Sequence, residues 1–199
     1  MKIRRTMLVA ASCALMATLA SANEERAHEI VGTRCYSCHG KTGLSTTAQF
    51  PKLAGQNVEY LTKQMFNFQA GLRVSTVMQE QIAGLTGNDI EALARYFSRQ
   101  RMVPEKPDDA HMLARGKRLY FDGKPQQSVS ACVSCHGPQA RGAQMLPRLA
   151  GQHATYIERQ LQAFIERSRT NDRYKMHMVA RNLTPDDIKA VAAFLSSQE

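Results

Sequence analysis

The sequence contains two copies of the pentapeptide Cys-x-x-Cys-His, and these residues have the clearest capacity for chemistry. One copy occupies residues 35–39 and the other occupies residues 132–136. Two thiols at this spacing on a helical turn can form thioethers with the vinyl groups of a porphyrin, and the following histidine can place an imidazole nitrogen on the iron. We therefore expect two covalently bound haem c groups, held by Cys35, Cys38, Cys132 and Cys135, with His39 and His136 as axial iron ligands.

The cysteine count favours haem attachment over the other roles of paired cysteines. Of five cysteines, Cys13 lies in an N-terminal segment that we expect to be removed, which leaves two pairs and no further thiol. A zinc site would need the two pairs to meet, but they lie in separate repeats. A thioredoxin-like redox pair needs a βαβ setting that the sequence does not predict. Structural disulfides would leave the two following histidines unexplained.

Residues 1–22 have the pattern of a cleavable signal peptide. A basic start precedes an apolar run at residues 6–20, and the small residues at 20–22 form a cleavage signature, so that Asn23 becomes the new N-terminus. The run is too short to span a membrane. We therefore predict export to the periplasm. Removal of three basic and no acidic residues lowers the formal net charge from +9 to +6.

The rest of the chain is an internal duplication. The second motif follows the first by 132 − 35 = 97 residues, and the segment Pro-Lys-Leu-Ala-Gly-Gln at 51–56 recurs as Pro-Arg-Leu-Ala-Gly-Gln at 147–152, an offset of 147 − 51 = 96. Two prolines among charged residues mark a linker at 102–110. We therefore predict one domain at 23–101 and a second at 111–199. Domains this small often need a cofactor for stability.

Both repeats are predicted to be helical. Apolar residues recur at three- and four-residue spacing over residues 57–69 and again over 154–167, which indicates amphipathic helices. The last helix of each repeat begins with a capping signature, Thr86 with Asp89 and Thr184 with Asp187. No segment alternates for long enough to form a strand. The predicted fold class is all-α, with the same small domain present twice.

With these motifs, the chain resembles the dihaem cytochrome c4 family, which has two tandem class I cytochrome c domains. The resemblance covers the mature chain and implies that a proline about 12 residues after each histidine accepts a hydrogen bond from its other ring nitrogen. Pro51 lies 12 residues after His39, and Pro147 lies 11 after His136. As an alternative, each proline simply interrupts the chain before its helix.

The resemblance also implies a methionine as the sixth ligand of each iron. Met78 lies 85 − 78 = 7 residues before Leu85, in the region where class I domains keep a methionine loop, and Met176 lies 183 − 176 = 7 before Leu183. We expect Met78 and Met176 to be the ligands. In the second repeat, Met178 and His177 remain alternatives.

Several other residues carry weaker signals. Gly116 and Tyr120 look like the Gly-x-x-x-aromatic contact between the first and last helices of class I domains, and the first repeat has no clean equivalent near residues 29–33. A glycine there allows two backbones to approach closely. His28, His111 and His153 have no counterpart in the other repeat, and we expect them to be solvated.

The predicted function is that of a one-electron carrier, not an enzyme. The family resemblance implies electron transfer in a respiratory chain, between a quinol-oxidising complex and a terminal oxidase. The alternatives are a dihaem peroxidase, which needs an open iron position, and a fixed electron-transfer subunit of a membrane complex. The expected partners are redox proteins and not nucleic acid, since the chain lacks basic runs. We expect a monomer, compatible with peripheral association with a membrane.

Overall fold

The computed structural model describes residues 23–199, so the predicted signal peptide at 1–22 lies outside the described residues. The described chain contains helices and two isolated β-bridges but no strand, and the predicted all-α fold class is confirmed. No helix among residues 23–199 is both long enough and apolar enough to cross a membrane.

The two repeats fold into the same order of helices. In the first, residues 23–30 are helical and continue into the π-helix η1 (Val31–Cys35) and α2 (Tyr36–His39), followed by α3 (Val58–Gln69), α4 (Thr76–Ile82) and α5 (Gly87–Ser98). In the second, the order is α6 (Ala110–Asp122), the 3-10 helix η2 (Pro125–Gln127), α7 (Val133–His136), α8 (Ala154–Ile165), α9 (Lys175–Ala180) and α10 (Pro185–Ser196).

The predicted amphipathic helices are α3 and α8. Helix α3 begins one residue after the predicted start, with Asn57 at its N-cap, and α8 ends before Arg167, whose φ of 59° is incompatible with continuing the helix. Both predicted capping boxes are present. The Thr86 hydroxyl accepts from the Asp89 amide while the Asp89 carboxylate accepts from the Thr86 amide, and the pair at the start of α10 repeats this arrangement.

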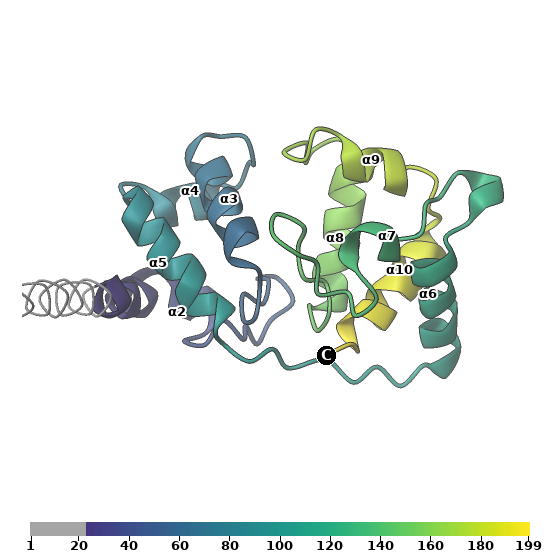
Figure 1. Ribbon diagram of the computed structural model, residues 1–199, viewed down its shortest axis with the longest axis horizontal. Helices are drawn as coiled ribbons and strands as arrows, with labels where there is room; N and C mark the ends of the chain where they lie inside the picture. The colour runs from purple at the N-terminus through teal and green to yellow at the C-terminus, as the bar shows by residue number, and fades with distance from the viewer. Residues whose placement is uncertain (1–22) are drawn as a thin grey trace, which may run out of the picture.

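Each repeat has its own hydrophobic core. The first core joins the helical residues 23–30 to α3 and α5, and the second joins α6 to α8 and α10. The two halves lie side by side along the long axis of the molecule, with α3 and α8 on their inner sides (Figure 1). Because each repeat has its own core, the contacts between the two halves are additional to the packing within each repeat.

The segment predicted as a linker has no regular secondary structure, but hydrogen bonds hold it to the second repeat. Residues 101–109 contain no helix, and α6 starts at Ala110, where the Asp109 carboxylate accepts from the Met112 amide at 2.9 Å. The Glu105 amide donates to the Ser196 carbonyl of α10 at 2.8 Å. The chain therefore passes from one half to the other along the lower edge of the view, past the C-terminus (Figure 1).

The contact between the first and last helices of the second repeat depends on a glycine. A Cβ at Gly116 would overlap the Ala190 carbonyl oxygen and would lie 2.6 Å from the Ala190 carbonyl carbon. In the first repeat, Ala27 and Val31 are buried in the core one and five residues after Arg26. Since Arg26 pairs with Asp89 at 3.0 Å as Arg115 pairs with Asp187 at 2.9 Å, Ala27 stands where the second repeat has Gly116.

The capping aspartate of α10 is also the most enclosed charge in the second repeat. Only 1% of the Asp187 side chain is exposed, and Lys124 Nζ lies 2.6 Å from its carboxylate. Burial alone would raise the pKa of Asp187, but hydrogen bonds from Lys124, Thr184 and Arg115 outweigh it and hold the pKa well below its usual range. The carboxylate is therefore charged in the folded protein.

Candidate functional site

None of the four cysteines of the two motifs forms a disulfide within residues 23–199. Burial raises the pKa of the Cys35 and Cys132 thiols to about 11. Reactive redox cysteines have a lowered pKa, and these two differ from them. No group of three or more His, Cys, Asp or Glu side chains among residues 23–199 is arranged to hold a metal ion, so the four cysteines do not assemble a zinc site.

The two motif histidines occupy equivalent positions at the ends of α2 and α7. His39 and His136 are each 6% exposed. His39 Nδ1 lies 2.9 Å from the Pro51 carbonyl oxygen, and His136 Nδ1 lies 3.1 Å from that of Pro147. The structure thus contains both contacts that the family resemblance implied.

These contacts determine the state of each imidazole. A carbonyl oxygen only accepts, so Nδ1 carries the ring proton and donates it. Burial lowers the pKa of His39 and His136, more than the proline carbonyl raises it, which favours the neutral ring. Nε2 then presents a lone pair, and neither ring has an Nε2 hydrogen bond to any residue in 23–199. A neutral, oriented imidazole in this state is a metal ligand.

The two predicted methionines lie in short helices instead of loops. Met78 is in α4 and packs against the first core, and Met176 is half-buried in α9. Each is followed four residues later by a fully buried side chain, Ile82 at 3% exposure and Ala180 at 0%. Residues four apart lie on the same helix face, so both methionines belong to the inward face of their helix.

The two alternatives to Met176 have different surroundings. Met178 is 52% exposed and stands two residues further along α9, at the position of the exposed Glu80 in α4. His177 is buried, but both of its ring nitrogens are occupied. Nδ1 donates to the Phe164 carbonyl at 3.1 Å, and Nε2 accepts from Arg167 Nε at 3.3 Å. This arrangement favours Met176.

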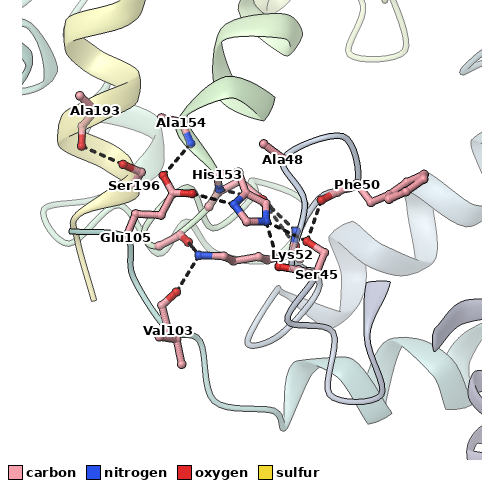
Figure 2. A network of polar contacts seen from close by, with 12 residues as sticks. Ser45, Ala48, Phe50, Lys52, Val103, Glu105, His153, Ala154, Ala193 and Ser196 are labelled. Carbon is pink, nitrogen blue, oxygen red and sulfur yellow. Dashed lines mark hydrogen bonds and ion pairs between the residues drawn. The ribbon is translucent and has the colours of Figure 1, made fainter. Parts of the chain in front are cut away.

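The expectation that His153 is solvated is wrong. His153 is 6% exposed, with Nδ1 2.7 Å from Glu105 Oε1 and Nε2 2.8 Å from the Ser45 hydroxyl (Figure 2). Beside it, Lys52 Nζ donates to the Val103 and Gly151 carbonyls at 2.8 Å each. The linker and both repeats meet at this residue. The hydrophobic periodicity of a single repeat cannot predict such a contact, because the partners of His153 come from other parts of the chain. His28 and His111 are exposed, as expected.

Two arginines bridge the halves in a repeat-related way. Arg73 Nη2 donates to the Tyr156 hydroxyl at 2.8 Å, and Arg169 Nη2 donates to the Tyr60 hydroxyl at 2.9 Å. Neither guanidinium has an ion pair with a carboxylate of residues 23–199. These two guanidinium groups add positive charge to the boundary between the halves, which suits anionic groups.

Comparison with known proteins identifies the family. The Cytochrome c family profile matches residues 113–199. A cytochrome c4 of Pseudomonas aeruginosa is 36% identical over 179 residues, which cover 88% of this chain and 89% of that protein. The crystal structure of reduced recombinant cytochrome c4 from Pseudomonas stutzeri matches with a TM-score of 0.82 at 35% identity, over 90% of this chain and 98% of that chain. The chain belongs to the cytochrome c4 family.

Membership confirms the predicted tandem class I cytochrome c fold and the two covalently bound haem c groups. The protein is a c-type cytochrome electron carrier. The residues present fit this cofactor, because each half offers two cysteines outside any disulfide and a neutral, oriented imidazole. A further relative, the thiosulfate dehydrogenase electron acceptor of Thiomonas intermedia, is 36% identical over 82% of this chain and 78% of that protein.

Proposed function

We propose that each Cys-x-x-Cys-His segment attaches one haem of this cytochrome. The segment on η1 and α2 serves a first domain at 23–101, and the segment on α7 serves a second at 111–199, with 102–110 between them. Neither pair forms a disulfide in the described residues, so both cysteines of each pair are available for the two thioether bonds of a haem.

One observation carries the assignment of the axial ligands. In both halves, a proline carbonyl fixes the Nδ1 proton of a buried histidine and leaves Nε2 available. His39 with Met78 would hold the iron of the first haem, and His136 with Met176 would hold that of the second. The haem supplies a one-electron iron couple when bound. With a methionine in the sixth position, neither site has room for a substrate, which suits a carrier and not a peroxidase.

The ligand assignment is tested by optical spectra of the purified holoprotein with haem counted per chain. We expect two haems, and a near-infrared sulfur-to-iron band that Met78→Ala and Met176→Ala each reduce by half. Carbon monoxide binding to the unmodified protein without denaturant, together with a high-spin haem, would overturn the assignment and favour a peroxidase.

The carrier acts in the periplasm, between a quinol-oxidising complex and a terminal oxidase. Respiratory transfer is the role that the cytochrome c4 resemblance implies. A second donor is supported by the likeness to the thiosulfate dehydrogenase electron acceptor of Thiomonas intermedia. The donors are compared by mixing the oxidised protein with a quinol-oxidising complex and quinol, or with thiosulfate dehydrogenase and thiosulfate. Faster reduction by the thiosulfate system would contradict the respiratory assignment.

A further inference from the structure

The last residue of the repeated Pro-x-Leu-Ala-Gly-Gln segment reaches into the opposite domain. The Gln152 side chain accepts from the Lys52 amide at 2.8 Å and donates to the Lys52 carbonyl at 2.8 Å. The Gln56 side chain does the same with Arg148, at 2.7 Å and 2.9 Å. Both glutamines are 5% exposed. The same side-chain oxygens also accept from the amide of the next residue, His153 at 3.1 Å and Asn57 at 3.0 Å. Since each side-chain oxygen meets only backbone donors and each side-chain nitrogen meets a backbone acceptor, only one orientation of the amide satisfies them all.

Each glutamine binds a peptide group that is also bound by an axial histidine. The Pro51 carbonyl, which accepts from His39 Nδ1 at 2.9 Å, and the Lys52 amide, which donates to Gln152, belong to the same peptide unit. A continuous path therefore runs from the His39 ring through one peptide group to Gln152 in the second domain.

The path in the other direction is equivalent. His136 Nδ1 contacts the Pro147 carbonyl at 3.1 Å, and the amide of the same peptide unit, that of Arg148, donates to Gln56 of the first domain. The duplication has therefore produced two crossed paths, and each starts at the histidine of one domain and ends on a side chain of the other.

The peptide unit transmits charge between its ends. Resonance couples its C=O and N–H groups, so an acceptor at the N–H makes the carbonyl oxygen more negative. Linked hydrogen bonds in a buried, low-dielectric site strengthen one another. A stronger acceptor at Nδ1 makes the imidazole a better donor to the metal, which stabilises the oxidised iron and lowers its reduction potential.

We propose that Gln152 and Gln56 are positioning residues that act across the domain boundary. Gln152 strengthens the His39 ligand of the first haem, and Gln56 strengthens the His136 ligand of the second. The inference rests on the proposed axial histidines. It makes the potential of each haem dependent on the contact between the domains, so that separating the domains raises both potentials.

The test uses the holoprotein with Gln152→Met or Gln56→Met, changes that keep side-chain length and remove all three hydrogen bonds of the side chain. The NMR signals of the Met78 and Met176 methyl groups in partly oxidised samples distinguish the two haems. Gln152→Met should favour reduction of the first haem about threefold, which is about 30 mV for a one-electron couple, and should leave the second unchanged. Gln56→Met should show the reverse pattern. The Nδ1 proton of the affected histidine should move upfield as its hydrogen bond weakens.

Asn57→Ala is the matched control. Asn57 Nδ2 also crosses the boundary, donating to the Leu146 carbonyl at 2.7 Å and the Arg141 carbonyl at 3.1 Å, but this side chain contacts neither the Pro51–Lys52 nor the Pro147–Arg148 peptide. The Asn57 backbone amide, which donates to Gln56 Oε1 at 3.0 Å, is kept in the alanine variant. This neutral change should alter neither potential. If Gln152→Met does not bind two haems, Gln152→Asn keeps the polarity and is too short to reach Lys52, and the same shift is expected.

The outcomes separate this inference from the proposed function. If His39 or His136 is not a ligand, the unmodified protein already lacks the paired ring-proton and methionine signals for that domain, and both proposals fail. If those signals are present, three results overturn the inference alone: no change in either potential, a shift of the glutamine's own domain, or an equal shift from Asn57→Ala.

Discussion

Replacing Gly116 with alanine tests whether the contact of α6 with α10 stabilises the second domain. The new Cβ would overlap the Ala190 carbonyl oxygen and lie 2.7 Å from Phe194 Cβ and 2.6 Å from the Ala190 carbonyl carbon. Ordinary contacts begin at 3.4 Å, so the helices must separate by at least 3.4 − 2.6 = 0.8 Å. Backbone atoms of a helix cannot turn aside as a flexible side chain can.

The expected magnitude combines two opposing effects. Overpacking a closely packed contact costs about 3 kcal/mol when no side chain can move away. Alanine is better than glycine within a helix by about 1 kcal/mol. The Gly116→Ala domain should therefore lose about 2 kcal/mol, which corresponds to a fall of roughly 8–16 °C in the midpoint of a domain this small.

Calorimetric unfolding of the holoprotein measures this loss, and Gly87→Ala provides the control. Gly87 starts α5, and a Cβ there meets only Phe66 Cζ at 3.8 Å. A second readout is Tyr120, whose pKa burial raises to about 12 and which should titrate lower once α6 moves. If Gly116→Ala and Gly87→Ala unfold at the same temperature, the close approach contributes nothing and the reasoning is wrong.

Three further predictions concern the ligands and the charges. Met178→Ala should leave the near-infrared sulfur-to-iron band unchanged, while Met176→Ala halves it; the opposite result would reassign the ligand. Asp187→Asn should destabilise the second domain by about 2–3 kcal/mol at pH 7, because a buried partner of two cations is lost. Since the folded pKa of Asp187 is depressed, this difference should be complete above about pH 4, the ordinary pKa of an aspartate, and should shrink progressively as the pH falls from there toward the depressed folded pKa, as followed by urea unfolding. Replacing Cys35 and Cys38 with alanine should leave one haem per chain by mass spectrometry and an unfolded first domain by NMR.

The sequence was sufficient to predict features that depend on local pattern. Hydrophobic spacing located α3 and α8 to within two residues at each end, and the threonine–aspartate signatures located the starts of α5 and α10. The short helix α4 was missed, although Ser75, which accepts from the Met78 amide at 3.3 Å, is an N-cap signal. Helix α9 has no side-chain cap at Tyr174, which enters it with a φ of 62°, but the Met176 amide donates to the Asp172 carboxylate at 2.6 Å.

Burial of His153 was not predictable from either repeat. It arises where Glu105 of the linker and Ser45 of the first domain close over a residue at the start of α8. The first domain has Asn57 at the equivalent N-cap position, half-buried and bonded across the boundary to other carbonyls. Matching positions in the two repeats thus acquired different partners, because the linker covers only one side of the boundary.

Gln56 and Gln152, in contrast, are matching positions that have kept equivalent partners. The repeat shows them at matched positions, which by itself would suggest equivalent roles inside each domain. In the folded chain their roles are equivalent but exchanged, since each contacts the peptide that follows the other domain's histidine-binding proline. If the glutamine served only the packing of its own domain, its effect would persist when the two domains were separated. A glutamine that acts across the boundary has its effect only while both copies are joined, which is why potentials measured on the intact protein are the appropriate test.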